Sequence, residues 1–201
     1  MPVGLPKIPY PLENDDDDEE PECNGLYRRR MLILGGEITS ELANVMTGVL
    51  IFFSLADSSK KFKFFINSLG GSVIDGVAIY DTIQTLLAPV ETIVMGIAAS
   101  MACFILNGGT SRTAFPHARV MMHQPSVSMS DLEEKDAELF LEVDEIQRMY
   151  DVIVDGFRKT TLKSYETIKA DMKRDLSMSA IEAQEYGLVD LIAGENIFQF
   201  P

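Results

Sequence analysis

The chain has 201 residues, of which 46% are hydrophobic and 24% charged, a composition typical of one folded domain rather than a disordered segment. Acidic residues outnumber basic residues 31 to 17, and the resulting net charge of −14 argues against nucleic acid or an anionic membrane as a partner. The two cysteines, Cys23 and Cys103, cannot form a disulfide framework, which indicates a reducing compartment.

The first 24 residues differ in composition from the rest of the chain. They contain five prolines, and eight of the ten residues 13–22 are carboxylates. Such a block repels itself and stays extended. We therefore interpret residues 1–24 as an acidic, proline-rich N-terminal segment, either a solvated tail or a docking arm. Residues 25–201 are expected to form the single folded domain.

Strand and helix patterns alternate after residue 30. Short apolar runs predict strands at 31–34, 62–66, 90–95 and 119–122, the first of them ended by Gly35 and Gly36, and a tight loop is expected over 67–71. Apolar residues at helical spacing predict helices over 41–55, 73–87 and 99–106. In the first of these helices the predicted buried face consists of Leu42, Val45, Met46, Val49 and Phe53. The alternating order predicts an α/β domain with a mostly parallel sheet.

A long amphipathic helix is predicted over residues 131–161. Residues 130–133 have the capping-box pattern, and an apolar stripe follows, formed by Leu139, Val143, Ile146, Tyr150, Ile153 and Phe157. A helix of about 28 residues would be about 42 Å long, so we expect part of it to pack outside the core, on another chain. A last short helix is predicted after a second capping box at 179–182 and should end at Gly187.

Metal and nucleotide sites are not indicated. The chain has two histidines, and neither Cys-x-x-Cys nor His-x-x-x-His spacing occurs. Residues 67–71 precede a predicted helix as an anion-binding turn does, but they lack the Lys-Ser/Thr of a P-loop and the three glycines of a dinucleotide site. The longest apolar run, 92–106, has 15 residues, fewer than the roughly 20 of a membrane span. We therefore expect no metal, no cofactor and no membrane segment.

Ser100 is the candidate nucleophile. It lies among small residues at a predicted strand-to-helix junction, where free backbone N–H groups of the helix can bind a developing oxyanion. A serine hydroxyl also needs a base that takes its proton. The alternative is that Ser100 only caps a buried helix, and the strict Gly-x-Ser-x-Gly elbow is absent.

Two histidines compete for the role of that base. His123 ends an apolar strand and is followed by an irregular segment, where catalytic groups often lie. His117 lies in a loop after Phe115 and Pro116. Spacing alone does not choose between them, and no carboxylate among the 31 acids stands out as the group that would orient the base.

Five segments resemble the proteolytic subunit of the Clp protease family. They are residues 65–71, 76–82, 95–101, 119–125 and 178–190, and the resemblance covers about residues 25–195 in order. Residues 1–9 resemble the plastid-encoded type of that subunit. The resemblance implies a crotonase-like fold in which residues 125–162 form a handle extension. It also implies a serine endopeptidase that hydrolyses unfolded proteins through a Ser-His-Asp triad.

Site residues and partners follow from the same resemblance. It implies Ser100 as the nucleophile, His123 as the base, Asp175 as the orienting acid, and the backbone N–H groups of Gly71 and Met101 as oxyanion donors. The implied partners are paralogous proteolytic subunits in two stacked heptameric rings, a hexameric AAA+ ATPase that uses the ATP, and unfolded protein substrates. The implied location is the chloroplast stroma, with a bacterial-type cytoplasm as the alternative.

The sequence departs from the family pattern at several positions. Leu69 replaces a usual proline, Ala102 replaces a usual glycine, and Leu162 occupies the place of a helix-ending glycine, while the three implied triad positions are intact. Two other functions stay open. The chain could be a non-catalytic structural subunit of the same mixed ring, or a crotonase-like acyl-CoA enzyme that uses backbone oxyanion donors without a serine triad.

Overall fold

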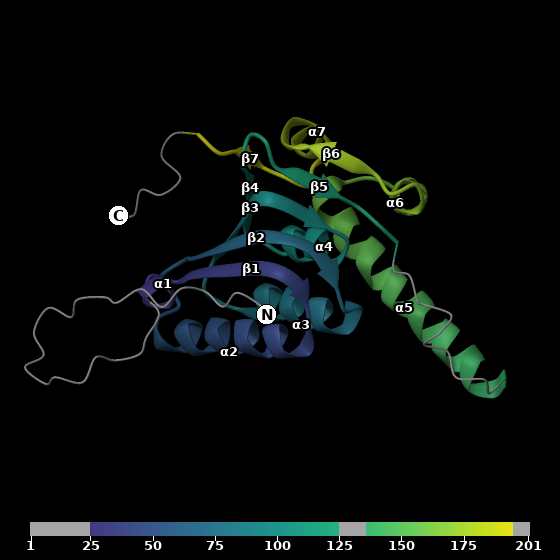
Figure 1. Cartoon of the computed structure of the whole chain (residues 1–201), viewed down its shortest axis with the longest axis horizontal. Helices are drawn as coiled ribbons and strands as arrows, with labels where there is room; N and C mark the ends of the chain where they lie inside the picture. Colours follow the sequence, from purple (N-terminus) through teal and green to yellow (C-terminus); the bar gives the residue numbers. More distant parts are fainter. Residues whose placement is uncertain (1–24, 125–135, 195–201) are drawn as a thin grey trace, which may run out of the picture.

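The computed structural model describes residues 25–124 and 136–194, with the backbone alone for residues 136–146. These residues form a twisted sheet covered by helices (Figure 1). The predicted N-terminal segment 1–24, the predicted capping box at 130–133 and residues 195–201 lie outside the described residues. The predicted boundary at residue 25 and the predicted handle limits therefore stay predictions.

The described strands join in one mostly parallel sheet. Its main path has the order β1-β2-β3-β4-β7, in which every neighbouring pair is parallel. β5 pairs in parallel with the second half of β3, and β6 pairs antiparallel with β5. The strands are β1 (Met31–Ile38), β2 (Phe62–Gly71), β3 (Val90–Ala99), β4 (Ser111–Ala114), β5 (Arg119–Met121), β6 (Ser177–Ser179) and β7 (Leu191–Ile192). This topology confirms the predicted α/β class.

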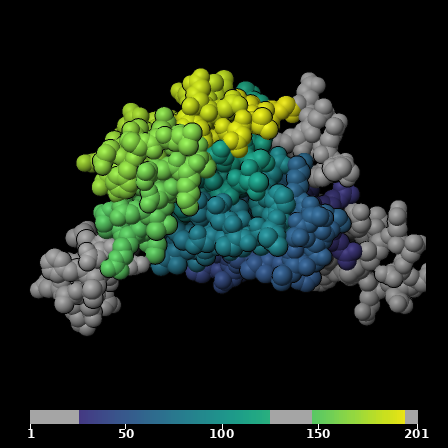
Figure 2. Space-filling view, turned by 180° about the vertical axis from the view of Figure 1, so that it is seen from behind, coloured from purple at the N-terminus to yellow at the C-terminus, as the bar shows by residue number. Residues whose placement is uncertain are grey.

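The helices cover the sheet and enclose its core. They are α1 (Gly25–Arg28), α2 (Ser40–Ala56), α3 (Val73–Thr85), α4 (Met101–Asn107), α5 (Asp136–Thr161), α6 (Tyr165–Lys173) and α7 (Ala180–Tyr186). α2 and α3 lie side by side along one face of the sheet (Figure 1). Seen from behind, the green and yellow C-terminal half packs against the blue and teal N-terminal half (Figure 2).

Aromatic rings tie three helices together in the core. Tyr80 of α3 stacks on Phe104 of α4 with ring centroids 4.1 Å apart, and Phe104 meets Phe157 of α5 edge to face. A Cβ on Gly156 would lie 2.5 Å from Phe104, so this glycine lets α5 approach α4 closely. All residues of α4 are buried, and the residue before it therefore has a rigid support.

Three predicted strands are longer in the structure than the sequence indicated: β3 continues to Ala99, and β1 and β2 continue through irregularities. Gly35 and Gly36 do not end β1, which continues to Ile38 across an irregularity where Gly36 has φ +97°. The predicted loop 67–71 belongs to β2, which continues past a second register shift. In both strands a bulge accommodates the glycine or polar residue, and strand pairing continues beyond it. The residues that predicted a turn therefore do not end the strand.

The predicted buried face of α2 is partly wrong. Met46 is buried as expected, but the fully covered positions beside it are Ala43, Leu50 and Ser54, and Val45 is 45% exposed. Leu42, Val49 and Phe53 pack at the edge of the core. Apolar residues surround nearly the whole helix, so periodicity could not identify the face that packs on the sheet.

The long helix is α5, and its described part agrees with the prediction. It ends at Thr161 as expected, and Tyr150, Ile153 and Phe157 of the predicted stripe are buried. The other three stripe residues lie in the segment of which only the backbone is described. The N-terminal half of α5 extends away from the sheet (Figure 1). All the α5 side chains that the structure describes in the core belong to the C-terminal half of the helix.

The prediction for the last helix is confirmed. Ser179 and Glu182 form the reciprocal capping box of α7, and Gly187 ends the helix in the left-handed conformation. The hydrogen bonds from Ser179 hold the pKa of Glu182 below its usual value. Five elements were not predicted from the sequence: α1, β4, α6, β6 and β7, which have between two and nine residues.

We expect Leu162→Gly to stabilise the protein. Leu162 follows α5 with φ +57° and its side chain is 88% exposed, so it has left-handed strain without compensating burial. Relief of about 1 kcal/mol should raise the Tm by about 2–4 °C, measured by thermal unfolding. Leu162→Ala is the control, because it removes the side chain but keeps the strain. An equal gain in both variants would contradict this explanation.

Candidate active site

Ser100 is the single residue between β3 and α4, at the strand-to-helix junction that the sequence predicted, although the strand is longer and the helix begins two residues later than predicted. Its backbone has φ +54° and ψ −124°, a conformation that non-glycine residues seldom adopt and that marks strained functional turns. Ser100 stands at the N-cap position, but its side chain makes no capping hydrogen bond. The capping alternative is therefore wrong, and the backbone makes a sharp strand-to-helix turn of the kind that presents a serine nucleophile in α/β-hydrolases.

Strand pairing brings His123 to the same sheet edge as Ser100. β3 and β5 run in parallel with Ala99 beside Met121, so the chain leaves both strands at one edge. The backbone N–H of Ser100 donates to the carbonyl of Met121 at 3.0 Å. His123 follows Met121 by two residues. Because carboxyl ends of parallel strands meet at one edge, residues distant in sequence become neighbours there.

The antiparallel pairing of β5 and β6 then places the carboxylate of Asp175 beside His123. Met121 lies opposite Ser177, and the same register, continued by two residues, sets His123 opposite Asp175. His123 Nδ1 and Asp175 Oδ1 are 2.7 Å apart. Hydrogen bonds on both sides support this pair, from Met122 N–H to the carbonyl of Leu176 at 3.0 Å and from Gln124 N–H to the carbonyl of Met172 at 3.2 Å.

This pair has the arrangement of a base with its orienting acid. A proton on Nδ1 is donated to the Asp175 carboxylate, and Nε2 is then a lone-pair acceptor that can take a proton. The His123 side chain is 29% exposed and that of Asp175 is 59% exposed. Water screens attraction between groups this exposed. The geometry of the pair therefore depends on the backbone that holds it.

His117 does not take part in this arrangement. It lies exposed in the turn between β4 and β5, while His123 is the histidine that meets Asp175. The structure thus brings together two of the three residues of the implied triad in a hydrogen bond and places the third, Ser100, at the same sheet edge.

The glycine pair at the end of β2 lies against Ser100. Gly70 has φ +103°, and a Cβ there would lie 2.9 Å from the Cβ of Ser100 and 3.2 Å from the backbone nitrogen of Met101. Gly71 has φ +151°, and its Cβ would meet the carbonyl oxygen of Ile38. Glycine at position 70 thus permits the close approach of β2 to the start of α4, and glycine at position 71 permits its close approach to β1.

The same approach places both implied oxyanion donors near the nucleophile. Met101 is the first residue of α4, so its N–H has no partner within the helix. Gly71 directly follows the glycine that touches Ser100. Our sequence reading did not single out Gly70, and the available signal was the Gly-Gly pair before a helix.

Asn67 fixes the separation of β2 and β3 near the site. Its Oδ1 accepts a hydrogen bond from the N–H of Ile97 at 3.2 Å, where the register of the two strands shifts. A Cβ on Gly96 would lie 2.5 Å from that oxygen. This side-chain bond compensates for the interrupted ladder and leads β3 toward Ser100.

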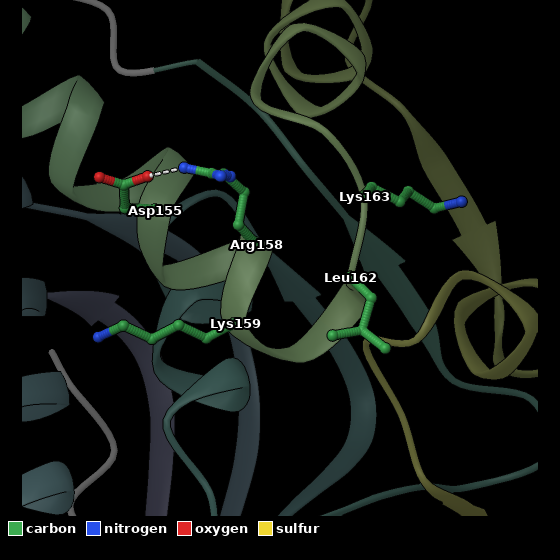
Figure 3. A pocket seen from close by; sticks show the side chains of 5 residues that line it. All are labelled: Asp155, Arg158, Lys159, Leu162 and Lys163. Carbon is green, nitrogen blue, oxygen red and sulfur yellow. Dashed lines mark hydrogen bonds and ion pairs between the residues drawn. The ribbon is translucent and has the colours of Figure 1, made fainter.

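A shallow pocket of about 490 Å³ lies elsewhere, at the end of α5. It is lined by Asp155, Arg158, Lys159, Leu162 and Lys163. Asp155 and Arg158 point toward each other and form an ion pair at 2.7 Å (Figure 3). None of the implied catalytic residues lines this pocket, so it adds nothing to the chemistry of the site.

Among the side chains that the structure describes, no three of His, Cys, Asp or Glu are grouped as metal ligands. In the part of the chain that the structure describes, no helix is long and apolar enough to cross a bilayer.

The chain is similar to known proteins over nearly its whole length. The family model described as Clp protease matches residues 16–196. The chain is 48% identical to a protein of Morus indica named ATP-dependent Clp protease proteolytic subunit, across 97% of this chain and 100% of the relative. It is 46% identical to the protein of that name from Nicotiana tabacum, with the same coverage, and 44% identical to that from Zea mays, across 98% and 92%.

Proposed function

Because the chain belongs to the Clp protease family and is a serine endopeptidase subunit of the ATP-dependent Clp protease, we propose that Ser100, His123 and Asp175 are its catalytic triad. The observation that carries this proposal is the 2.7 Å hydrogen bond between His123 and Asp175 at the sheet edge where Ser100 lies. The family assignment argues against the acyl-CoA enzyme that the fold alone left open.

The proposed reaction is a two-step acyl transfer. Ser100 Oγ attacks the carbonyl carbon of the peptide bond while His123 Nε2 accepts the hydroxyl proton. The resulting oxyanion accepts hydrogen bonds from the N–H groups of Gly71 and Met101. His123 then gives its proton to the departing amine. Water hydrolyses the Ser100 ester in the second step, again with His123 as base.

Asp175 has an orienting role in this proposal. Its carboxylate holds the imidazole in the tautomer that has a free lone pair on Nε2, and it stabilises the imidazolium formed during attack. The reaction needs no metal and no cofactor, because serine, imidazole and backbone N–H groups provide nucleophile, base and oxyanion site. In this proposal the ATP is used by a partner ATPase.

Covalent labelling of Ser100 tests the proposed function. A fluorophosphonate should phosphonylate Ser100 in the intact complex, and mass spectrometry of the peptide that contains residues 95–101 should locate the adduct. This readout separates the chain from any paralogous subunits in the same particle. A complex that cleaves peptides but leaves Ser100 unlabelled would show a non-catalytic structural subunit instead.

Family membership also implies an oligomeric proteolytic ring that works with an ATPase. The finer proposal is two stacked heptameric rings of this chain with paralogous subunits, fed with unfolded proteins by a hexameric AAA+ ATPase. Its support here is the exposed apolar surface of α2, on which Phe52 is 66% and Leu55 84% exposed. A chloroplast stroma location is proposed because the relatives named above come from plants.

We expect this chain to occur in particles of ring size and to be inactive as a monomer. Patches such as that formed by Phe52 and Leu55 are normally covered in an assembly. Sedimentation of the native complex, with subunits identified by mass, should find the chain in a particle many times its own 22.3 kDa. An active species of monomer mass would refute this expectation.

A further inference from the structure

The Asp175 carboxylate needs a support that its own ion pair does not provide. It is 59% exposed, and its backbone has φ +54° in a tight turn after α6. An exposed carboxylate in a strained turn orients a partially exposed imidazole only weakly, because water screens the electrostatic attraction between them. Whatever fixes this turn therefore determines whether the His123–Asp175 hydrogen bond forms.

The buried carboxylate of Asp171 is a polar anchor beside that turn. Asp171 is 9% exposed and lies in the last turn of α6. Its Oδ2 accepts a hydrogen bond from the Tyr186 hydroxyl at 2.6 Å, and its Oδ1 forms an ion pair with Arg174 at 2.7 Å. A buried carboxylate with two donors is strongly held in place.

We infer that Asp171, fixed by Tyr186, is a positioning residue for Asp175; this inference rests on the proposed triad. Asp171 acts on the turn at two points. Its side chain holds Arg174, the residue before Asp175, and its backbone carbonyl accepts the N–H of Leu176, the residue after it, at 3.3 Å. The turn is thus fixed on both sides of the catalytic carboxylate.

Tyr186 connects Asp171 to the helix that follows β6. It is the last residue of α7, the helix that begins directly after β6, and β6 pairs with the strand that leads to His123. Burial, and then the hydrogen bond to Asp171, raise the pKa of Tyr186, so its hydroxyl stays a donor at physiological pH. The Tyr186–Asp171 bond therefore joins α6, which leads into the Asp175 turn, to α7, which follows the strand paired with β5.

Tyr186→Phe is the direct test, because it removes one hydroxyl and leaves the ring. Asp171 would then retain only the pairing with Arg174, whose side chain is 64% exposed. We expect kcat for short-peptide hydrolysis and the rate of Ser100 phosphonylation to fall roughly 10-fold, because small misplacements of catalytic groups cost about this much or more. KM should be unchanged, since neither residue is part of a substrate pocket in this proposal.

Tyr165→Phe is the matched control. The Tyr165 hydroxyl also donates to a carboxylate at 2.6 Å, that of Asp151, and also ties α6 to a neighbouring helix, but at the opposite end of α6. Its loss should lower thermal stability about as much as Tyr186→Phe while leaving kcat and the labelling rate nearly unchanged. Both variants are measured within the assembled complex.

Measurements in the Asp175→Asn variant distinguish a role of Tyr186 and Asp171 in positioning Asp175 from a general role in stabilising the fold. If Tyr186 and Asp171 act through Asp175, Tyr186→Phe should slow labelling no further when Asp175→Asn is already present. Equal labelling rates in Tyr186→Phe and Tyr165→Phe would overturn the inference, as would an undiminished effect in the Asp175→Asn background. No labelling of Ser100 in the unmodified complex would instead refute the proposed function, and the inference with it.

Discussion

Ser100→Ala and His123→Ala are each expected to reduce short-peptide hydrolysis by this subunit roughly 10³-fold or more. Either change removes the activated nucleophile, since an unassisted serine hydroxyl is a poor one and an imidazole alone forms no acyl-enzyme. The double variant should be little worse than either single one, because the two residues act as a unit. The measurement is the initial rate on a fluorogenic peptide without ATP, in complexes whose paralogous sites are silenced.

His117→Ala is the control for the loss of a histidine. It should retain nearly full activity, because His117 is exposed and has no contact with the His123–Asp175 pair. Asp175→Asn should preserve assembly while it lowers kcat, since an amide does not stabilise an imidazolium as a carboxylate does. Full activity of Ser100→Ala under these conditions would remove the catalytic reading of this chain.

Gly70→Ala is the second change for which we expect a large effect. An added Cβ would lie 2.9 Å from the Cβ of Ser100 and 3.2 Å from the nitrogen of Met101. The methyl group would displace Ser100 and narrow the space beside the proposed oxyanion donor, so we expect a loss of roughly 10²-fold or more in kcat. Fluorophosphonate labelling of Ser100 should slow in parallel.

Gly36→Ala is the matched control for the backbone cost of this change. Gly36 has φ +97°, close to the +103° of Gly70, but nothing lies within 4 Å of its added Cβ. It therefore imposes similar left-handed strain without a collision at Ser100. Similar losses in catalytic rate for both variants would mean that strain in the strands, and not contact with Ser100, explains the effect.

Much of the fold could be predicted from local sequence pattern. Alternating apolar runs and helical stripes gave the α/β class, the start of α2, the burial of Tyr150, Ile153 and Phe157 on α5, and the place of Ser100 at a strand-to-helix junction. The capping box of α7 and its glycine end were also correct. These features depend on residues only a few positions apart in the sequence. The local pattern of apolar and capping residues therefore contains the information that predicts them.

The predictions failed where a local signal had more than one structural solution. Gly35 and Gly36 predict the end of a strand, but they lie at a bulge within β1. α2 is apolar on nearly every side, so its packing face was chosen by the sheet and not by its periodicity. β4, β6 and β7 have between two and four residues, too few to show an alternation.

The sequence by itself determined a candidate nucleophile, two candidate bases and no orienting acid; the family resemblance then implied His123 and Asp175. Only the tertiary structure joined these two residues, which are 52 positions apart, in one hydrogen bond. The reason is physical: their meeting depends on the register of two three-residue strands, β5 and β6, and on the parallel pairing of β5 with β3. Register between strands distant in sequence depends on how whole elements pack, so no local pattern in the sequence contains it.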